Sequence, residues 1–421
     1  MTMGLDLDSP SHRGKATVHS PVRFGCVGLG GYAEHICGLL QECSNSQTAP
    51  VHLAAVWDPQ IAAHEALAAS LRAAGVKIFN QYEELLSDGI EALWLPVPID
   101  LHRSYTLKAL DAGKAVMCEK PAAGSVDDVD AMIAARDRTG LPVAIGYQDI
   151  YDPTTLQIKR QLLDGEIGTI QSVAVWGCWP RSEAYFRRSV WAGRFQRDGT
   201  WILDSPANNA MSHFINLALF LLGPTERESA QPLAVEAELY RANDIENYDT
   251  CGLRIMAPIP VLVLLTHACA TSIEPRIELR GSAGCLRYQA FDSVEIHGRR
   301  GHQSFPLDAG GVRSAMVDRF ARWIRGSLGS DLVATLEVAR APVVAINGAS
   351  EAVAVAQIPD AHRKDLTLDG ATLRTIAGVE AAFDHCAATG QMPHESGQCP
   401  WSSPPGTRDL RGYTHFAGPR V

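Results

Sequence analysis

The stretch Arg23-Phe24-Gly25-Cys26-Val27-Gly28-Leu29-Gly30-Gly31-Tyr32-Ala33 decides the fold of the first part of the chain. Its apolar first half predicts a buried strand, and the residues from Tyr32 onward predict the start of a helix. The spacing Gly28-x-Gly30-x-x-Ala33 between them is typical of a dinucleotide-binding turn, in which backbone without side chains approaches a pyrophosphate. Ordinary turns carry such glycines too, but the strand before and the helix after favour the dinucleotide site.

Length and composition restrict the class of protein. With 421 residues, 46% of them hydrophobic and 20% charged, the chain is typical of a soluble protein of two domains with appendages. The net charge of -10 argues against nucleic acid or an anionic membrane as a partner. Residues 1–20 lack the apolar centre of a secretory signal and predict a flexible tail. The ten cysteines form no Cys-x-x-Cys pair, which favours reduced thiols and a cytoplasmic protein.

Strands and helices alternate after the opening turn. Apolar runs predict further strands at residues 51–57, 76–79, 92–98, 115–118 and 142–145, with helical segments between them. This alternation predicts an α/β domain over residues 21–147 with a parallel, doubly wound sheet. Ligands of such sheets bind beyond the carboxyl ends of the strands. The residues predicted at those ends are Gly28, Asp58, Pro98 and Lys120.

Asp58 follows the second predicted strand, where a dinucleotide-binding domain holds the adenosine ribose. The polar insert at residues 44–50 accounts for its longer distance from the glycines. A plain turn residue before Pro59 is the alternative interpretation. An acid at this position repels a 2′-phosphate, so NAD is favoured over NADP as the cofactor.

These motifs resemble the Gfo/Idh/MocA family, named after glucose–fructose oxidoreductase and inositol dehydrogenase. The resemblance spans roughly residues 22–360 and rests on the segments Gly28–Ala33, Pro98–His102, Ala112–Pro121 and Gly146–Pro153. It implies an N-terminal Rossmann domain followed by a C-terminal α+β domain with an open, mostly antiparallel sheet. It also implies a homodimer or homotetramer formed through that sheet.

The resemblance assigns roles to several residues of the first domain. The lysine that matches Lys120 lies beside the nicotinamide and the substrate hydroxyl, and the peptide bond before the matching proline, here Pro121, is often cis. An ammonium there can orient an alcohol and stabilise a developing alkoxide. We expect Glu119 to order the loop, whereas His102 fits a helix cap near the cofactor or a structural role. The predicted cofactor-binding set is Gly28, Gly30, Gly31, Tyr32, Ala33, Asp58, Pro98, His102, Glu119 and Lys120.

An aromatic and arginine-rich stretch, residues 176–201, follows the start of the second predicted domain, residues 148–369. Aromatic faces beside arginines suit a stacked sugar ring or a substrate carboxylate. A long, well-packed connection or a subunit contact is the alternative interpretation. The predicted substrate-binding residues are Gln148, Trp179, Tyr185, Arg187, Asp204 and Asn208.

A helix is predicted from the cap at Asp204 or Ser205 to Gly223-Pro224. Asn209, His213 and Asn216 lie at i, i+4 and i+7 and so share one face. Family members carry Asp-x-x-x-His in this helix, with the histidine as general base, and His213 matches it. Asn209 stands in the place of the aspartate, which removes a charge that raises the histidine pKa. Asp204 is a candidate replacement.

The rest of the chain predicts a meander of antiparallel strands between residues 234 and 297, then helices at 314–326 and 335–357. One face of this sheet is expected to cover helices and the other to pair with another subunit. Residues 370–421 predict a helix and a tail rich in Pro, Gly and Ser. Its aromatic residues, Trp401, Tyr413 and Phe416, predict that the tail docks on the protein.

Together these features predict an NAD-dependent oxidoreductase acting on a secondary alcohol of a sugar, sugar acid or cyclitol. His213 would accept the hydroxyl proton while Lys120 and Asn209 hold the oxygen, and no metal is required because the lysine replaces a Lewis acid. Two alternatives stay open: a glycoside hydrolase or lyase that retains NAD and oxidises a sugar transiently, and a non-catalytic NAD(H)-binding regulator.

Overall fold

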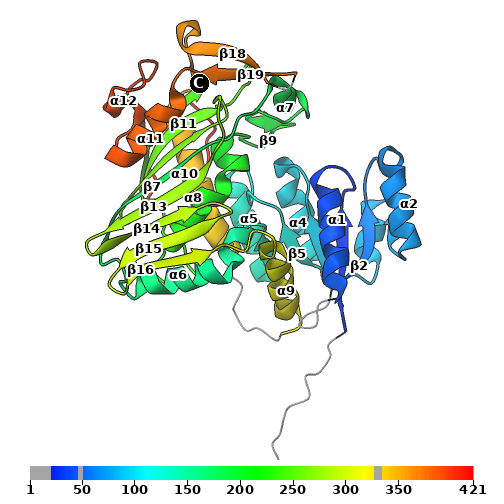
Figure 1. Ribbon diagram of the computed structural model, residues 1–421. Helices are drawn as coiled ribbons and strands as arrows, with labels where there is room; N and C mark the ends of the chain where they lie inside the picture. The colour runs from blue at the N-terminus through cyan, green and yellow to red at the C-terminus, as the bar shows by residue number, and fades with distance from the viewer. Residues whose placement is uncertain (1–19, 46–50, 327–333, 369, 421) are drawn as a thin grey trace, which may run out of the picture.

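The computed structural model describes residues 20–45, 51–326, 334–368 and 370–420. The flexible tail expected at residues 1–20 therefore lies almost entirely outside the described residues. Two domains stand side by side, with the blue and cyan N-terminal domain next to a large green and yellow sheet (Figure 1). No helix among the described residues is long and apolar enough to cross a bilayer.

The N-terminal domain is a six-stranded parallel sheet in the order β3-β2-β1-β4-β5-β6. The central strands are buried along their length because helices cover both faces, so they are apolar without alternation. The strands are β1 (Val22–Val27), β2 (Val51–Trp57), β3 (Lys77–Phe79), β4 (Ala92–Leu95), β5 (Ala115–Cys118) and β6 (Val143–Ile145). The helices are α1 (Tyr32–Glu42), α2 (Glu65–Ala73), α3 (Tyr82–Ser87), α4 (His102–Asp111) and α5 (Val126–Thr139). The predicted Rossmann topology is confirmed.

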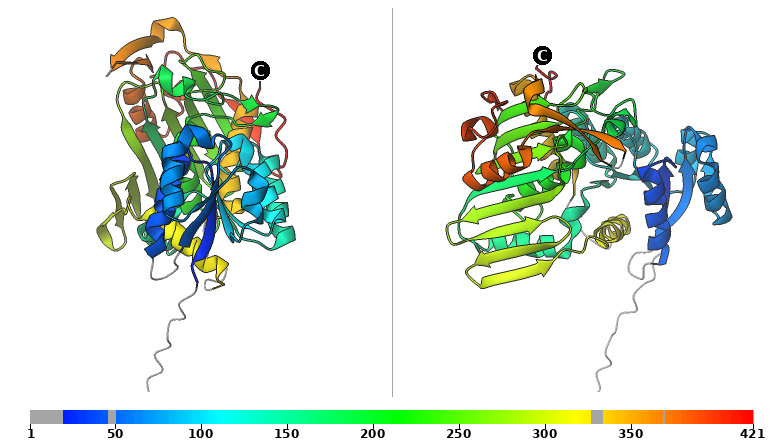
Figure 2. Two further views of the ribbon diagram at one scale, coloured as in Figure 1. Left: turned by 90° about the vertical axis from the view of Figure 1, so that its right-hand side faces the viewer. Right: turned by 45° about the horizontal axis from the view of Figure 1, so that its top comes forward.

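The C-terminal domain is built on a ten-stranded, mostly antiparallel sheet in the order β16-β15-β14-β13-β7-β12-β11-β10-β17, with β20 also paired to β10. Its inner face packs on the helices α6 (Pro153–Leu163), α8 (Ser212–Leu221) and α10 (Leu336–Ala352), as Figure 2 shows from two sides. The strands are β7 (Ile170–Cys178), β10 (Ala234–Arg241), β11 (Thr250–Met256), β12 (Pro260–Thr266), β13 (Ile273–Gly281), β14 (Gly284–Gln289), β15 (Ser293–Gly298), β16 (Gly301–Pro306), β17 (Ala356–Gln357) and β20 (Gly406–Asp409).

The helix predicted over residues 205–223 is broken. Pro206–Ala210 forms a single wide turn, closed by the Met211 N–H donating to the carbonyl of Pro206 (2.9 Å), and α8 starts only at Ser212. Ser205 caps the turn through the Asn208 N–H. This i to i+5 turn inserts an extra residue, so the strict i, i+4, i+7 spacing does not hold across it.

The C-terminal segment covers part of the outer face of the large sheet. Helix α11 (Val379–Thr389) builds a second apolar cluster there with Leu262, Leu264 and Trp401, and α12 (Pro393–Ser396) contacts α11. Tyr413 and Phe416 are buried in the main core, so the three aromatic residues of the tail dock as expected. The predicted boundary after residue 369 falls inside a hairpin, β18 (Arg363–Leu368) and β19 (Ala371–Ile376), which the sequence did not reveal.

The two domains are joined by a buried amide on α10. Asn347 accepts from the Val126 N–H (2.8 Å) and donates to the Gly124 carbonyl (2.9 Å), both at the start of α5. Gly124 itself touches the backbone of the second domain, because a Cβ there would lie 2.2 Å from the Trp201 carbonyl oxygen. Asn347 is fully buried, so neither backbone group has water as a substitute partner.

We therefore expect Asn347→Leu to lower the free energy of unfolding by about 2–4 kcal/mol, since two buried backbone groups lose their partner. Ser350→Ala on the same helix is the matched control, because its hydroxyl bonds only within α10 and its loss costs about 1 kcal/mol. Urea unfolding followed by tryptophan fluorescence measures both. Equal effects of the two substitutions would contradict a special role for the Asn347 bridge.

Candidate active site

A cavity of about 440 Å³ lies where the two domains meet. It is bordered by the glycine turn, by the carboxyl ends of β4 and β5, by the wide turn before α8 and by the start of α9 (Val312–Ile324). The carboxyl ends of the parallel strands thus meet the second domain at one point. The lining residues are Gly30, Tyr32, Pro96, Val97, Pro98, Ile99, Glu119, Lys120, Trp191, Asn209, His213 and Arg313.

The glycine turn has the geometry that a pyrophosphate needs. Gly28 and Gly31 adopt φ angles of 108° and 58°, which favour glycine. Helix α1 begins after Gly31 without a side-chain cap, so no side chain occupies the position where its N-terminus can face an anion. At Gly30, a Cβ would come within 2.6 Å of the imidazole of His64, a neighbour that the sequence analysis missed.

Asp58 ties the glycine turn to the end of β2. Its two carboxylate oxygens accept from the Leu29 N–H (2.7 Å) and from the Gln60 N–H (2.6 Å). Asp58 therefore stabilises the turn that follows β2, as the alternative interpretation of this residue expected. Each oxygen keeps a free lone pair, so the ribose-binding role stays a compatible prediction.

His102 and Glu119 support the loops rather than the cavity centre. The His102 ring nitrogens lie 2.8 Å from the Pro121 carbonyl and 2.9 Å from the Val97 carbonyl, and the side chain is buried. This favours the structural role for His102. Glu119 accepts from the Trp94 indole (3.1 Å), and burial raises the pKa of its carboxyl group. The Lys120–Pro121 peptide bond is cis, as the resemblance implied.

Lys120 reaches across to the second domain. Its Nζ donates to the backbone oxygen of Asn209 (2.9 Å) and to the Oδ1 of the same residue (3.2 Å). Burial lowers the pKa of the ammonium, opposed by the carboxylates of Glu119, Asp204 and Asp149. Of three N–H donors, one is left for a ligand.

Asp204 orients Asn209 instead of replacing the missing aspartate. Its two oxygens accept from Asn209 Nδ2 (2.6 Å) and from the Gly193 N–H (2.6 Å). With Nδ2 donating to Asp204, the Asn209 oxygen is turned to Lys120. Burial raises the pKa of the Asp204 carboxyl group, opposed by these hydrogen bonds.

His213 has a carboxylate partner that the sequence analysis missed. Nδ1 of His213 lies 2.8 Å from Oδ2 of Asp149, which follows the carboxyl end of β6. Burial lowers the pKa of the imidazole, and the Asp149 carboxylate opposes this shift. The neutral ring is therefore the form expected at pH 7, with its proton on Nδ1 and Nε2 available as a base. Asp149 follows the carboxyl end of a parallel strand, as Lys120 does, so the same position in the sheet could have indicated it.

Several predicted residues lie outside the cavity. Trp179 packs on Phe214 and Phe291 and donates to Glu274, and Arg187 is largely exposed and paired with Glu183. The Asn208 amide donates to the Ile202 carbonyl, and Asn216 is buried in α8. Gln148 lines a small recess next to the cavity. The substrate interpretation of Arg187 and Trp179 is thus not supported by their positions.

Five lining residues were not predicted as site residues: three lie around Pro98 (Pro96, Val97 and Ile99), and two come from the second domain (Trp191 and Arg313). Trp191 lies in the aromatic stretch and presents the flat surface that the sequence analysis expected from its neighbours. Arg313, at the start of α9, donates to the Tyr32 hydroxyl (3.0 Å) and adds a cation beside Lys120. No motif marks Arg313, because it comes from the far end of the sheet domain.

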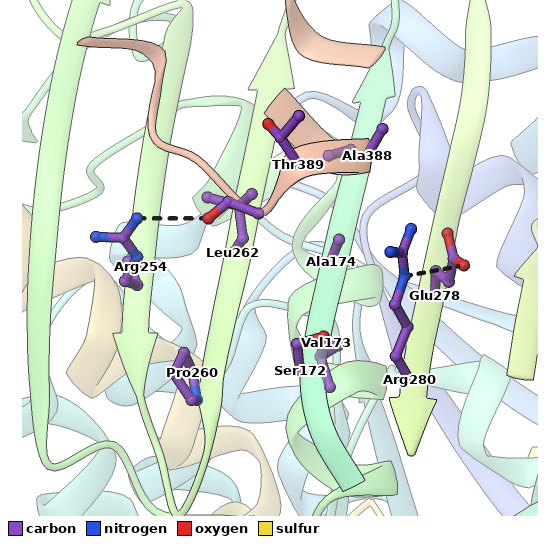
Figure 3. Close-up of a pocket in the computed structure, with 12 residues that line it drawn as sticks. Ser172, Val173, Ala174, Arg254, Pro260, Leu262, Glu278, Arg280, Ala388 and Thr389 are labelled. Carbon is purple, nitrogen blue, oxygen red and sulfur yellow. Dashed lines mark hydrogen bonds and ion pairs between the residues drawn. The ribbon is translucent and has the colours of Figure 1, made fainter. Parts of the chain in front are cut away.

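Other candidate sites lie away from this cavity. Figure 3 shows a smaller cavity, about 200 Å³, on the outer face of the large sheet under the end of α11. Its charges are neutralised within the protein, since Arg280 pairs with Glu278 and Arg254 with Glu236 and Glu395. On the same face of the sheet, Glu295, His297 and His302 form the one group with metal-ligand spacing among the described residues.

Replacing Asp149 tests the histidine pair directly. Asp149→Asn removes a carboxylate that favours the imidazolium, so we expect the His213 pKa to fall further below 6.5. The surface pair of His415 and Asp127, also 2.8 Å apart, is the matched control. There the carboxylate raises the histidine pKa, so Asp127→Asn should lower the pKa of His415 and leave His213 unchanged. Histidine NMR titration measures both, and an unchanged His213 pKa in Asp149→Asn would contradict the pairing.

Comparison with known proteins agrees with this geometry. Residues 22–147 match the sequence profile described as the oxidoreductase family with an NAD-binding Rossmann fold. Inositol 2-dehydrogenase of Rhizobium meliloti is 26% identical over 292 residues, which cover 68% of this chain and 82% of the relative. D-apiose dehydrogenase of Paraburkholderia graminis is 29% identical over 48% of this chain and 51% of the relative. An uncharacterized oxidoreductase of R. meliloti is 35% identical, but the match spans only 33% of its length.

Solved structures share the fold across both domains. The WlbA dehydrogenase from Bordetella pertussis, in complex with NADH and UDP-GlcNAcA, superposes with a TM-score of 0.63 at 21% identity. That match covers 78% of this chain and 97% of the other. Aldose-aldose oxidoreductase from Caulobacter crescentus gives 0.64 at 20% identity, over 78% and 97% of the two chains. Residues 22–147 thus match the NAD-binding Rossmann domain of the Gfo/Idh/MocA oxidoreductases, the family that the sequence motifs resemble.

Proposed function

We propose that the protein is an NAD-dependent dehydrogenase that oxidises a secondary alcohol of a sugar, sugar acid or cyclitol, or reduces the matching ketone. One observation carries the proposal: Lys120 from one domain and His213 from the other line a single cavity with the dinucleotide turn. The curated relatives that act on inositol and on D-apiose support this substrate class.

The residues present fit NAD. The uncapped N-terminus of α1 suits its pyrophosphate, and Asp58, beside the turn, suits the adenosine ribose and repels a 2′-phosphate. When bound, NAD supplies the hydride acceptor. The side chains described above then bind the alcohol and move its proton.

Lys120 holds the alcohol oxygen in this proposal. Asn209 occupies two of its three N–H donors and fixes the direction of the third. A buried cation at this position stabilises negative charge as it develops on the oxygen, and burial strengthens the effect because water is excluded.

His213 accepts the proton. Asp149 holds Nδ1, so Nε2 is the acceptor, and the lowered pKa keeps the ring neutral at pH 7. Because the base must be neutral, kcat/KM is expected to fall as the pH drops through the His213 pKa, which lies below 6.5. Trp191 offers a flat apolar face for the ring of the substrate.

NADH formation across a panel of sugars, sugar acids and cyclitols tests the proposal. We expect His213→Ala to lower kcat by about 10²–10⁴-fold, as for loss of a general base, and Lys120→Met to lower it at least as much. His415→Ala, a surface histidine with its own carboxylate partner, should leave turnover unchanged. Cofactor affinity should survive in His213→Ala and His415→Ala, since neither alters the glycine turn, Asp58 or Lys120.

Two results would overturn the proposed dehydrogenase function. Cleavage of glycosides without net NADH formation, lost in both active-site variants, would assign the NAD-retaining hydrolase instead. Tight NADH binding without turnover of any substrate would assign the regulator.

We also propose that copies of the chain associate through the large sheet. Because α11 and α12 cover one end of its outer face, the half formed by β13 to β16 is left for a second copy. Light scattering of the purified protein and of Arg287→Glu, on that half, tests this: the substitution should shift an oligomer toward monomer. A monomeric wild type would contradict it.

A further inference from the structure

Two arginines flank one tyrosine ring beside the candidate active site. The guanidinium carbon of Arg188 lies 3.5 Å from the ring centroid of Tyr185, and that of Arg181 lies 4.9 Å from the same centroid. Such stacking favours arginine because its planar cation is weakly hydrated and its N–H donors stay free at the edge. Tyr185 therefore holds two cations close together.

Neither arginine forms an ion pair with a residue that the structure describes. Among the described residues, no carboxylate lies within ion-pair distance of either guanidinium, whereas the adjacent Arg187 pairs with Glu183. Arg181 and Arg188 each donate one N–H to a nearby backbone carbonyl, and the buried Nε of Arg181 has no acceptor. Two uncompensated cations with unused donors form a binding surface for an anion.

The neighbouring groups agree with a positive local potential. His267 contacts the Tyr185 ring, and its Nδ1 lies 2.8 Å from the Trp179 carbonyl. Burial lowers the His267 pKa to about 3, and both arginines add to that shift. The nearby acid Asp204 is buried and already bonded to Gly193 and Asn209.

Arg188 connects this pair of arginines to a residue that lines the candidate cavity. Arg188 also lies over the Trp191 ring, 4.9 Å from its centroid, and Trp191 lines the cavity with Lys120 and His213. An anion held by Arg188 and Arg181 is thus separated from the proposed reacting hydroxyl by one aromatic ring. That separation suits two substituents of one sugar.

We infer that the substrate carries an anionic group, a carboxylate or a phosphate, which Arg188 and Arg181 bind at the edge of Tyr185. This inference rests on the proposed dehydrogenase and narrows its substrate class. Both groups present oxygens that match the fork of a guanidinium. The neutral sugar ring then lies over Trp191, with its hydroxyl at Lys120 and His213.

The test measures binding by the full chain loaded with NADH, using calorimetry and three probes that share one ring: glucose, D-glucuronate and glucose 6-phosphate. We expect at least one charged probe to bind about 10–100-fold more tightly than glucose, as for one or two charge-assisted hydrogen bonds. The probe that shows the preference identifies carboxylate or phosphate as the recognised group.

Two neighbouring arginines provide the variant and its control. Arg188→Gln should remove most of that preference and leave glucose binding unchanged. Arg187→Gln, at a position that is exposed and paired with Glu183, should retain it. Arg188→Lys should keep part of the affinity, because it keeps the charge and loses the fork. Thermal melting of each variant shows that it is folded.

The outcomes separate this inference from the proposed function. Equal binding of all three probes, or equal effects of the Arg187 and Arg188 substitutions, would overturn the anion site. If neutral sugars are then still oxidised to give NADH, the proposed dehydrogenase function is retained without the anion site. A third outcome is that a charged probe is preferred, that this preference depends on Arg188, and that no sugar acid or sugar phosphate gives NADH. That result would support the anion site and overturn the proposed dehydrogenase function.

Discussion

The contact between Lys120 and Asn209 is the interaction on which the site depends. It joins the carboxyl end of a parallel strand to the wide turn before α8, and so it brings an ammonium from one domain to the histidine of the other. Asp204 fixes the amide of Asn209, and Asp149 fixes the ring of His213. Asn209 and His213, which line the cavity, are thus each held by a carboxylate that does not line it.

Asn209 stands where the family that the sequence resembles carries an aspartate, and a different element places a carboxylate beside the histidine. Asn209 cannot provide charge, but it holds Lys120 through its oxygen. The carboxylate beside His213 comes instead from Asp149, after β6. A carboxylate therefore still lies beside the imidazole, and the lysine contacts a neutral amide.

Much of the fold follows from local patterns in the sequence. The glycine turn, the order of strands and helices, and the strand ends that carry Lys120 and Asp58 are all read from short apolar runs and their boundaries. Strand β16 and the hairpin β18–β19 were missed because their side chains are mostly exposed and polar, which leaves no apolar alternation. The wide turn at Pro206–Ala210 was missed because an i to i+5 bond leaves no mark in a helical pattern.

The residues of the candidate site also divide into those that the sequence predicts and those that only the folded chain brings together. Lys120 and His213 are predictable because each stands in a recognisable motif. Arg313 and the pairing of Asp149 with His213 depend on how distant segments meet, which periodicity does not encode. The sequence does not distinguish the adjacent Arg187 and Arg188. In the folded chain, Arg187 pairs with Glu183, whereas Arg188 lies on the Tyr185 ring.

The buried amide of Asn347 has a consequence for motion. Rotation of one domain away from the other would break both of its hydrogen bonds and separate Gly124 from Trp201, so hinge opening at this junction is costly. Small side-chain movements at the rim are cheaper, because Tyr32 is exposed there and its partner Arg313 is only half-buried. Exchange of a bound cofactor is therefore expected to be gated by these two side chains, while the domains keep a fixed orientation through the catalytic cycle.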